Sequence, residues 1–397
     1  MPKVSDILNR LEESATLAMA RRSRELSAAG KDVISLSLGE PDFNTPDFIK
    51  DAAKKAIDDN FSKYPPVNGY LDVRDAIAKK FKRDNNLDYT PNQIVVSTGA
   101  KQSIINAIMS LVNPGDEVIL LAPYWVSYKE MVSIAGGTVN IINSSIEDDF
   151  KVTSHQLAAA ISSKTKLIIF SSPCNPTGSV FLQEELEEFS RLILQQENLY
   201  VISDEIYEHI NFTGKHFSIG SVPGMAERTI TVNGVSKGFA MTGWRIGYVG
   251  APQWIADACT KFQGQITSGA NTIAQKATRA AVEADPAITH PLRDAFLKRR
   301  DLVIEKLEAI KGLKVNRPQG AFYLFPDVSE FLGKSVNGVK INTAEELCNY
   351  ILEDVHLAVV DGAAFGAPQC IRISYATSDD ILVKAMDRLK TALDKLV

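Results

Sequence analysis

Cysteine is scarce in this sequence of 397 residues, and excess positive charge and long hydrophobic runs are absent. The four cysteines lie far apart and form no C-x-x-C pair, so the sequence indicates neither a disulfide framework nor a zinc site. Lysine and arginine number 43 against 48 acidic residues, and the net charge of −5 argues against a nucleic-acid-binding surface and, weakly, against an anionic membrane partner. No metal site is predicted, because no ligand spacing is found among His155, His209, His216, His290 and His356.

No apolar run approaches the roughly 18 residues that a membrane helix needs. Residues 1–20 carry acidic side chains among their apolar ones and do not form the uninterrupted hydrophobic segment of a signal peptide. We therefore expect a cytoplasmic protein with reduced cysteines and no membrane partner. The length favours two packed lobes over one core.

The middle of the chain alternates short apolar runs with amphipathic stretches. Helical spacing occurs over 102–111 and 184–194, between runs that have the composition of buried strands. This alternation predicts an α/β fold whose large domain has a mostly parallel sheet flanked by helices, with ligands at the carboxyl ends of the strands. The predicted strands are 94–97, 117–121, 166–170, 199–203 and 229–232.

The two ends of the chain predict a smaller α+β domain. A charge-rich helical pattern covers 291–312, strand-like runs follow at 321–325 and 371–374, and an amphipathic helix is expected over 379–396. We predict a large domain of residues 46–286, and a small domain of residues 1–45 and 287–397 that closes over the site.

Polar residues follow the predicted strands. The small residues Gly99 and Ala100, at the start of a helix, would let backbone N–H groups bind a phosphate, although a tight strand–helix turn is the commoner explanation of such residues taken alone. Asn175 stands between two prolines, so its amide is aimed either at a phenolic oxygen or carboxylate of a ligand, or only at its own turn. Asp204 ends an apolar strand three residues before Tyr207, and its buried carboxylate calls for a pyridinium, an arginine or a helix cap.

The most informative stretch covers residues 233–247. Lys237 lies there among glycines and uncharged residues, a setting that lowers the pKa of an amine and suits a nucleophile that forms a Schiff base. Ser236 and Arg245 offer a hydroxyl and a guanidinium to a phosphate. An ordinary solvated lysine is the default elsewhere, but this neighbourhood disfavours it.

Two further residues complete the set. Trp125 follows a strand and offers a flat ring for stacking on a heterocycle, or simply packs in the core. Arg372 interrupts an apolar strand, where its partner is either a substrate carboxylate or a structural acid. An amine, a phosphate site, a carboxylate for a ring nitrogen, a stacking ring and a carboxylate receptor together indicate pyridoxal phosphate.

In these stretches the sequence resembles the class I aminotransferases of fold type I over essentially its whole length. The motifs that carry the resemblance are SLGEPDF (37–43), residues 64–69, PYWVSY (123–128), NPTG (175–178), SDEIY (203–207), residues 236–247, AFG (364–366) and IRISYA (371–376).

The resemblance implies that pyridoxal 5′-phosphate is the cofactor and that Lys237 is catalytic, binding the cofactor and then moving the proton at the substrate α-carbon. It also implies a homodimer with shared active sites, in which Tyr64 reaches the phosphate of the neighbouring subunit. The implied cofactor-binding residues are Gly99, Ala100, Lys101, Trp125, Asn175, Asp204, Tyr207, Ser236, Lys237, Arg245 and Tyr64. The implied substrate-binding residues are Gly39, Lys101, Trp125, Asn175 and Arg372.

Within the family, Ser14-Ala-Thr16 and the run 99–102 make the chain most similar to bacterial aspartate aminotransferases that recognise the distal carboxylate of the substrate with a lysine at the position of Lys101. The enteric and animal enzymes of the family bind the distal carboxylate with an arginine from the partner subunit instead. The corresponding stretch here, residues 265–271, contains no arginine. The implied reaction converts L-aspartate and 2-oxoglutarate into oxaloacetate and L-glutamate by a ping-pong mechanism. An aromatic amino acid or prephenate aminotransferase is the alternative; a β-lyase or decarboxylase is less favoured, and a transcription regulator is disfavoured.

Overall fold

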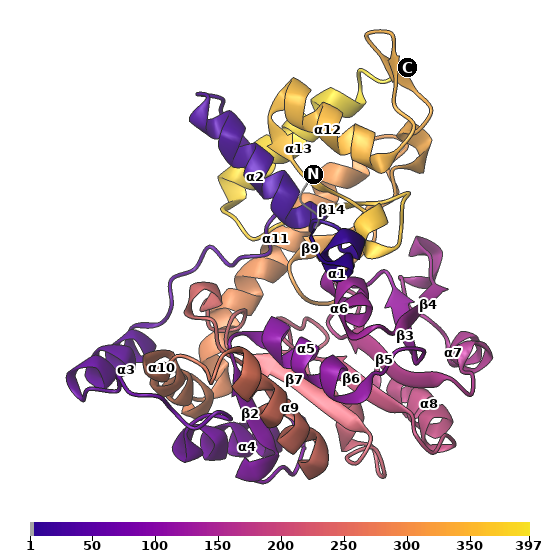
Figure 1. The fold of residues 1–397 in the computed structure, drawn as a ribbon. Coiled ribbons are helices and arrows are strands. Elements are labelled where there is room, and N and C mark those ends of the chain that lie inside the picture. The colour runs from indigo at the N-terminus through magenta and orange to yellow at the C-terminus, as the bar shows by residue number, and fades with distance from the viewer. Residues whose placement is uncertain (1–3) are drawn as a thin grey trace.

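A seven-stranded sheet forms the centre of the computed structural model, which describes residues 4–397 (Figure 1). The strand order is β2-β8-β7-β6-β5-β3-β4; β8 pairs antiparallel with β2 and β7, and the other pairs are parallel. The bounds are β2 (Ile94–Ser97), β3 (Glu117–Ala122), β4 (Thr138–Asn143), β5 (Thr165–Ser171), β6 (Tyr200–Asp204), β7 (Thr229–Gly234) and β8 (Gly247–Gly250). The mostly parallel α/β sheet predicted from the sequence is confirmed.

Helices cover both faces of this sheet, because alternate strand residues point to opposite sides. Val118 and Leu120 pack against α5, α6 and α9, whereas Ile119 and Leu121 pack on the other side with α7 and α8. A third apolar cluster joins β2 and β8 to α3, α4 and α10. The bounds are α3 (Asp47–Asp58), α4 (Leu71–Asn85), α5 (Ala100–Leu111), α6 (Ser127–Ala135), α7 (Ser154–Ala160), α8 (Gln183–Leu194), α9 (Gln253–Ile266) and α10 (Thr272–Glu283).

The second lobe lies above the sheet in Figure 1 and combines the C-terminal third of the chain with residues near the N-terminus. Its helices are α2 (Ala15–Ala28), α11 (His290–Glu308), α12 (Ala344–Val355) and α13 (Asp379–Leu393), whereas α1 (Asp6–Arg10) contacts α6 beside the sheet. Its strands are β1 (Ile34–Ser35), β9 (Tyr323–Leu324), β10 (Ser335–Val336), β11 (Val339–Lys340), β12 (Leu357–Ala358), β13 (Val360–Asp361) and β14 (Ile371–Ser374). We propose the domain division predicted above; residues 1–3 of it lie outside the described part.

Ion pairs of Arg299 attach the segment around Asp42, which follows β1, to this second lobe. Arg299 on α11 is 9% exposed and forms a bidentate pair with Asp42, at 2.7 and 2.8 Å, while its Nε lies 3.3 Å from Asp379 at the start of α13. The planar guanidinium suits this geometry. The segment that includes Gly39 is therefore tied to the helices of the second lobe.

Two strands of the sheet were not predicted, for identifiable reasons. β4 lies at the sheet edge, and its residues Thr138–Asn143 are mostly exposed or half-buried, so they lack an apolar run. β8 begins and ends with glycine. A Cβ on Gly247 would lie 2.1 Å from the backbone nitrogen of Ala100, so close packing against the start of α5 excludes a side chain there.

Three predicted elements are shorter in the structure. The helix expected over 291–312 ends at Glu308, and the one expected over 379–396 ends at Leu393. The strand expected over 321–325 is reduced to Tyr323–Leu324. Ala321 has a positive φ of 56°, which β-strand geometry does not allow, and this explains the late start.

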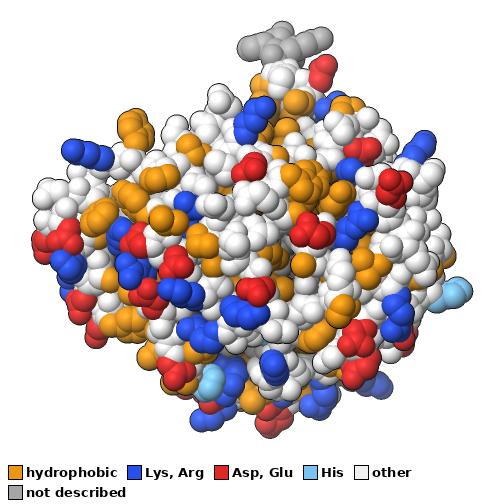
Figure 2. Space-filling model, turned by 90° about the horizontal axis from the view of Figure 1, so that it is seen from below, with side chains coloured by type: hydrophobic (Ala, Val, Ile, Leu, Met, Phe, Trp, Pro, Cys, Tyr) orange, Lys and Arg blue, Asp and Glu red, His pale blue; other side chains and the backbone are white. Residues whose placement is uncertain are grey.

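Acidic and basic side chains are interspersed on the face of the molecule that Figure 2 shows. Among the described residues, no helix is both long enough and apolar enough to cross a bilayer.

Candidate active site

A cavity of about 240 Å³ is lined by residues that follow strands of the sheet and by residues of the second lobe, such as Tyr323 and Arg372. The strands β2, β3, β5, β6 and β7 point the same way, so the residues that follow them meet at one edge. Eleven of the thirteen predicted site residues line this cavity: Gly39, Ala100, Lys101, Trp125, Asn175, Asp204, Tyr207, Ser236, Lys237, Arg245 and Arg372.

Lys237 lies in the loop after β7, and its amine donates a hydrogen bond of 2.5 Å to the carbonyl of Gly39. Burial lowers the pKa of this lysine to about 8, although the carboxylate of Glu40 works in the opposite direction; the positive charges of Arg372 and Arg245 lower it further. An amine with this pKa has a substantial neutral fraction near pH 8, as a nucleophile requires.

Asp204 ends β6 and is 5% exposed. Burial raises the pKa of its carboxyl group to about 6, while hydrogen bonds from Tyr128 and the backbone of Ile206 hold it down. The Tyr128 hydroxyl lies 2.8 Å from Oδ2 and the Ile206 nitrogen lies 3.3 Å from Oδ1. These contacts are neutral donors, so they leave the carboxylate charge for a cationic ligand such as a ring N–H⁺.

A cradle is formed where α5 starts, between Gly99 and the guanidinium of Arg245. Gly99 has a positive φ of 82°, and a Cβ there would lie 2.4 Å from Nη2 of Arg245, so only glycine admits the guanidinium so close to the helix N-terminus. The guanidinium also donates to the carbonyl of Thr242 at 3.0 Å, and Ser236 lines the same side of the cavity. A positive charge, a hydroxyl and free N–H groups at a helix start are a typical anion site.

Arg372 is buried in β14 with 2% exposure. Its hydrogen bonds go to neutral oxygens: Asn175 Oδ1 at 2.8 Å, the Ser37 carbonyl at 2.5 Å and the Thr16 hydroxyl at 3.4 Å. Its Nε has no hydrogen-bond partner within residues 4–397. Because its partners are neutral, the guanidinium keeps both charge and donor capacity for a carboxylate ligand.

Lys101 and Trp125 lie together on another wall of the cavity. The lysine nitrogen is 4.9 Å from the centre of the tryptophan ring system, in cation–π geometry. Partial burial, together with the charge of Arg245, lowers the pKa of Lys101.

Two predicted residues lie outside the cavity lining. Gly99 is adjacent to it, in the cradle. Tyr64 is far more exposed than any core tyrosine, at 93%, and does not contribute to the cavity of its own chain.

Sequence reasoning assigned no role to Tyr128, Tyr323 and Leu17, which also line the cavity, and it used Ser14 and Thr16 only as signs of a subgroup. Tyr128 lies in the motif PYWVSY, three residues after Trp125, so its position in that motif could have identified it as a residue of the site. Tyr323 lies in an apolar run that gave no such signal.

The turn after Asp204 presents its residues to two different environments. Asp204 and Tyr207 line the cavity, whereas Glu205 and Glu208 are buried and do not line it. The Nδ2 of Asn85 bridges the two glutamates, at 3.1 and 2.6 Å.

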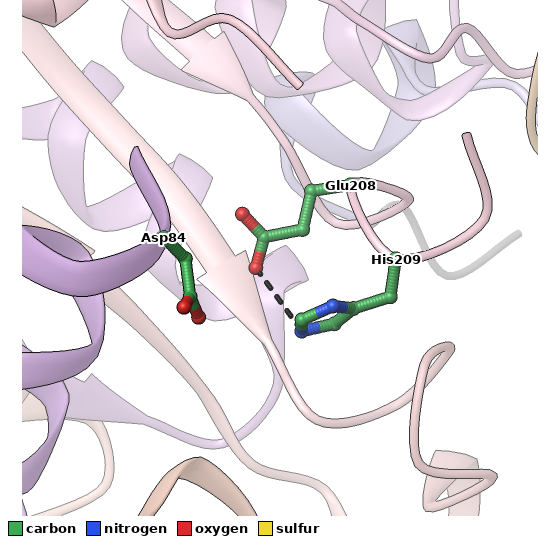
Figure 3. Close-up of side chains that lie close together, drawn as sticks. All are labelled: Asp84, Glu208 and His209. Atoms are coloured by element: carbon green, nitrogen blue, oxygen red, sulfur yellow. Dashed lines mark ion pairs between the residues drawn. The ribbon is translucent and has the colours of Figure 1, made fainter. Parts of the chain in front are cut away.

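The buried carboxylates are compensated by a lysine. Figure 3 shows Glu208 beside His209, with Oε1 and Nε2 3.3 Å apart, and Asp84 on the opposite side. Lys80, 2% exposed, contacts Glu208 and lies 3.7 Å from Asp84. Burial alone would raise the pKa of Glu208, but Lys80 and the two neighbouring histidines, His209 and His216, bring it to about 2. The lysine thus supplies the positive charge that a metal ion would otherwise bring.

The fold places a buried lysine amine, a guanidinium at a helix start and a buried arginine in one cavity, a combination typical of enzymes. The chain belongs to the class I and II aminotransferases, since the sequence profile described as "Aminotransferase class I and II" matches residues 31–389.

Relatives agree with this assignment over almost the whole chain. The aspartate/prephenate aminotransferase of Cereibacter sphaeroides is 46% identical over 98% of both chains, and the aspartate aminotransferase of Pinus pinaster is 46% identical over 96% of this chain and 79% of its own. Among solved structures, the aspartate aminotransferase of Rhizobium meliloti has a TM-score of 0.96 at 39% identity over the full length of both chains. That of Thermus thermophilus with maleate has a TM-score of 0.93 at 41% identity, over 99% of this chain and 100% of its own.

The family implies pyridoxal phosphate as cofactor, and the residues of the cavity fit it. The cradle at Gly99 and Arg245 suits the phosphate, the buried carboxylate of Asp204 suits a ring nitrogen that carries a proton, and the Lys237 amine suits an aldehyde carbon.

Proposed function

We propose that the chain is an aspartate aminotransferase, which converts L-aspartate and 2-oxoglutarate into oxaloacetate and L-glutamate by a ping-pong mechanism. The observation that carries the proposal is the presence of two cationic side chains, Arg372 and Lys101, in the cavity that contains Lys237. A dicarboxylic amino acid has one α-carboxylate and one distal carboxylate. Arg372 and Lys101 can bind one of them each. The similar Thermus thermophilus enzyme was solved with maleate, itself a dicarboxylate, which supports this choice.

Each group in the cavity has its own task in this reaction. Arg372 and the backbone of Gly39 hold the α-carboxylate, and Lys101 holds the distal one. Trp125 and Asn175 would orient the ring of the cofactor and the substrate. Pyridoxal phosphate, when bound, supplies a carbonyl that takes up the amino group and a ring that disperses negative charge from the α-carbon.

Lys237 moves the proton. Its amine, with a pKa lowered to about 8 by burial, would accept a proton from the substrate α-carbon and donate it to the cofactor carbon that ends up carrying the amino group. Asp204 would keep a proton on the ring nitrogen of the bound cofactor through charge pairing, and Tyr207 would donate a hydrogen bond to the phenolic oxygen of that ring. These roles match the burial and charge of each group.

The test is the absorption spectrum of the purified protein with pyridoxal phosphate, before and after L-aspartate alone. We expect a visible band that L-aspartate converts to the band of the aminated cofactor, while a Lys237→Ala protein shows no conversion. A visible band that is indifferent to aspartate would contradict the substrate, and a protein that binds no pyridoxal phosphate would contradict the function.

Prephenate is the second candidate substrate, because the relative from Cereibacter sphaeroides is named for both aspartate and prephenate. A single lysine is also a less directional clamp than an arginine, which leaves room for other distal groups. Comparing aspartate and phenylalanine as donors, and 2-oxoglutarate and prephenate as acceptors, separates the two. An aromatic donor or prephenate that reacts while aspartate does not would replace the leading assignment.

We also propose a homodimer with shared sites. The exposed ring of Tyr64 and an open groove of about 830 Å³ beside Arg245 support this arrangement, since a second copy can bring its Tyr64 into that groove. Mixing Tyr64→Ala chains with Lys237→Ala chains tests it. Hybrid dimers then contain one site with both native residues, so activity above that of either parent is expected; its absence would place Tyr64 in its own subunit or outside the site.

A further inference from the structure

Tyr323 is a buried phenol in the cavity lining, and neither the motifs nor the proposed mechanism gives it a task. It belongs to β9, is 1% exposed and lines the cavity between Gly39 and Tyr207. Its hydroxyl lies 2.7 Å from the hydroxyl of Tyr207, which is its one hydrogen-bond partner within residues 4–397. It also lies so close to Gly39 that a Cβ there would come within 1.7 Å of the phenolic oxygen.

The direction of this hydrogen bond follows from counting protons. A tyrosine hydroxyl has one proton to donate and lone pairs with which to accept. In the proposed function, Tyr207 gives its proton to the phenolic oxygen of the cofactor, so it has none left for Tyr323. Tyr323 must then be the donor and Tyr207 the acceptor. Burial raises the pKa of Tyr323, so this donor keeps its proton.

We infer that Tyr323 is a positioning residue, whose hydroxyl donates to Tyr207 and thereby orients and strengthens the hydrogen bond from Tyr207 to the cofactor oxygen. The inference rests on the proposed function. Hydrogen bonds in series polarise one another, and each is strengthened by roughly a tenth to a third. The Tyr207 bond is therefore stronger with Tyr323 behind it than alone.

Packing alone does not account for a tyrosine at this position. The Tyr323 ring lies 4.7 Å from the guanidinium of Arg372, and the ring of Phe365 lies 4.8 Å from the same group. Phe365 shows that a phenylalanine ring suffices for this contact. The hydroxyl of Tyr323 is the part that packing leaves unexplained, and it lies within hydrogen-bond distance of Tyr207.

The experiment uses the cofactor-loaded protein and the pH at which the visible absorption of the bound cofactor changes. A hydrogen bond to the phenolic oxygen favours its deprotonated form, so weakening that bond raises the midpoint. Tyr207→Phe is expected to raise it most. Tyr323→Phe keeps the ring and should raise it by roughly 0.1 to 0.5 pH unit, since only part of the bond's strength is lost. In the Tyr207→Phe/Tyr323→Phe protein the shift should equal that of Tyr207→Phe alone.

Tyr375→Phe is the matched control. Tyr375 is fully buried in the same lobe, donates to the carbonyl of Ala321 at 3.3 Å and does not line the cavity. It should leave the midpoint unchanged. The dissociation rate of pyridoxal phosphate provides a second readout, with Tyr323→Phe between wild type and Tyr207→Phe.

The outcomes separate this inference from the proposed function. A midpoint that moves with Tyr207→Phe but not with Tyr323→Phe, or two shifts that simply add in the double variant, overturns the role of Tyr323 alone. A protein that binds no pyridoxal phosphate overturns both.

Discussion

Replacing Tyr128 with phenylalanine should change the pH range over which Asp204 weakens the cofactor-free fold. The pKa of Asp204 is raised from 3.8 to about 6 by burial, against hydrogen bonds that lower it. The native state therefore keeps a proton that the unfolded chain has already lost, and stability falls as the pH rises from about 4 to about 6. A shift of about two pH units corresponds to about 3 kcal/mol, which is fully lost above pH 6.

The hydroxyl of Tyr128 limits this loss. It donates to the carboxylate at 2.8 Å, and a hydrogen bond to a charged acceptor is worth about 1.5–3 kcal/mol. Without it, the pKa of Asp204 should rise by about one to two further units, and stability should keep falling to between about pH 7 and 8.

Urea unfolding of the cofactor-free protein between pH 4.5 and 8.5 measures the effect. Asp204→Asn has no titrating group at this position, so the pH dependence of its difference from wild type isolates Asp204 from all other residues. We expect that difference to grow up to about pH 6 in the native background, and up to about pH 7 to 8 in the Tyr128→Phe background. Parallel curves for wild type and Asp204→Asn would refute the raised pKa, and an unchanged range in Tyr128→Phe would refute the role of the hydrogen bond.

The remaining predictions concern single substitutions. Lys237→Ala should abolish transamination while thermal unfolding stays close to wild type, and full turnover in this variant would eliminate the lysine as the catalytic amine. Arg372→Lys keeps the charge but loses the fork, so kcat/KM for aspartate should fall about ten- to a hundredfold, the equivalent of one charge-assisted contact; an unchanged kcat/KM would make Arg372 a structural residue. Gly247→Ala should weaken pyridoxal phosphate binding, because its Cβ would lie 2.1 Å from backbone that supports the phosphate cradle. Gly264→Ala is its control: the nearest atom to a Cβ there is 3.7 Å away in a helix, so stability should rise by about 0.5–1 kcal/mol. Equal cofactor affinity in both glycine variants would contradict the steric argument.

The sequence predicted the centre of the sheet well because burial and strand composition coincide there. Ile94–Ser97 is found as predicted, and the other four predicted strands differ by one or two residues at their ends. Prediction of strands from the sequence fails where contacts with distant parts of the chain determine which residues a strand contains. Gly247 of β8 admits the start of α5 and Gly250 admits the ring of Tyr89, whereas in the sequence alone these two glycines resemble a loop.

The candidate site was predictable where a side chain needs an unusual setting. A lysine among glycines and an arginine in an apolar strand are conspicuous, and Lys237 and Arg372 indeed line one cavity. Tyr323 was not, since a tyrosine in an apolar run is ordinary until its hydroxyl is seen to face Tyr207. The roles of these residues, the homodimer and a cytoplasmic location stay predictions.

The hydrogen bond between Lys237 and Gly39 links the two lobes. Lys237 follows a sheet strand, whereas Gly39 is held through Asp42 to Arg299 of the second lobe. Attachment of a cofactor to the amine ends this bond, and so does separation of the lobes. Two equilibria that share one interaction are thermodynamically coupled, with the same free energy in each direction. We therefore expect cofactor loading to weaken the contact between the lobes at Gly39; faster hydrogen exchange in residues 38–42 after loading would register this effect, and unchanged exchange would contradict it.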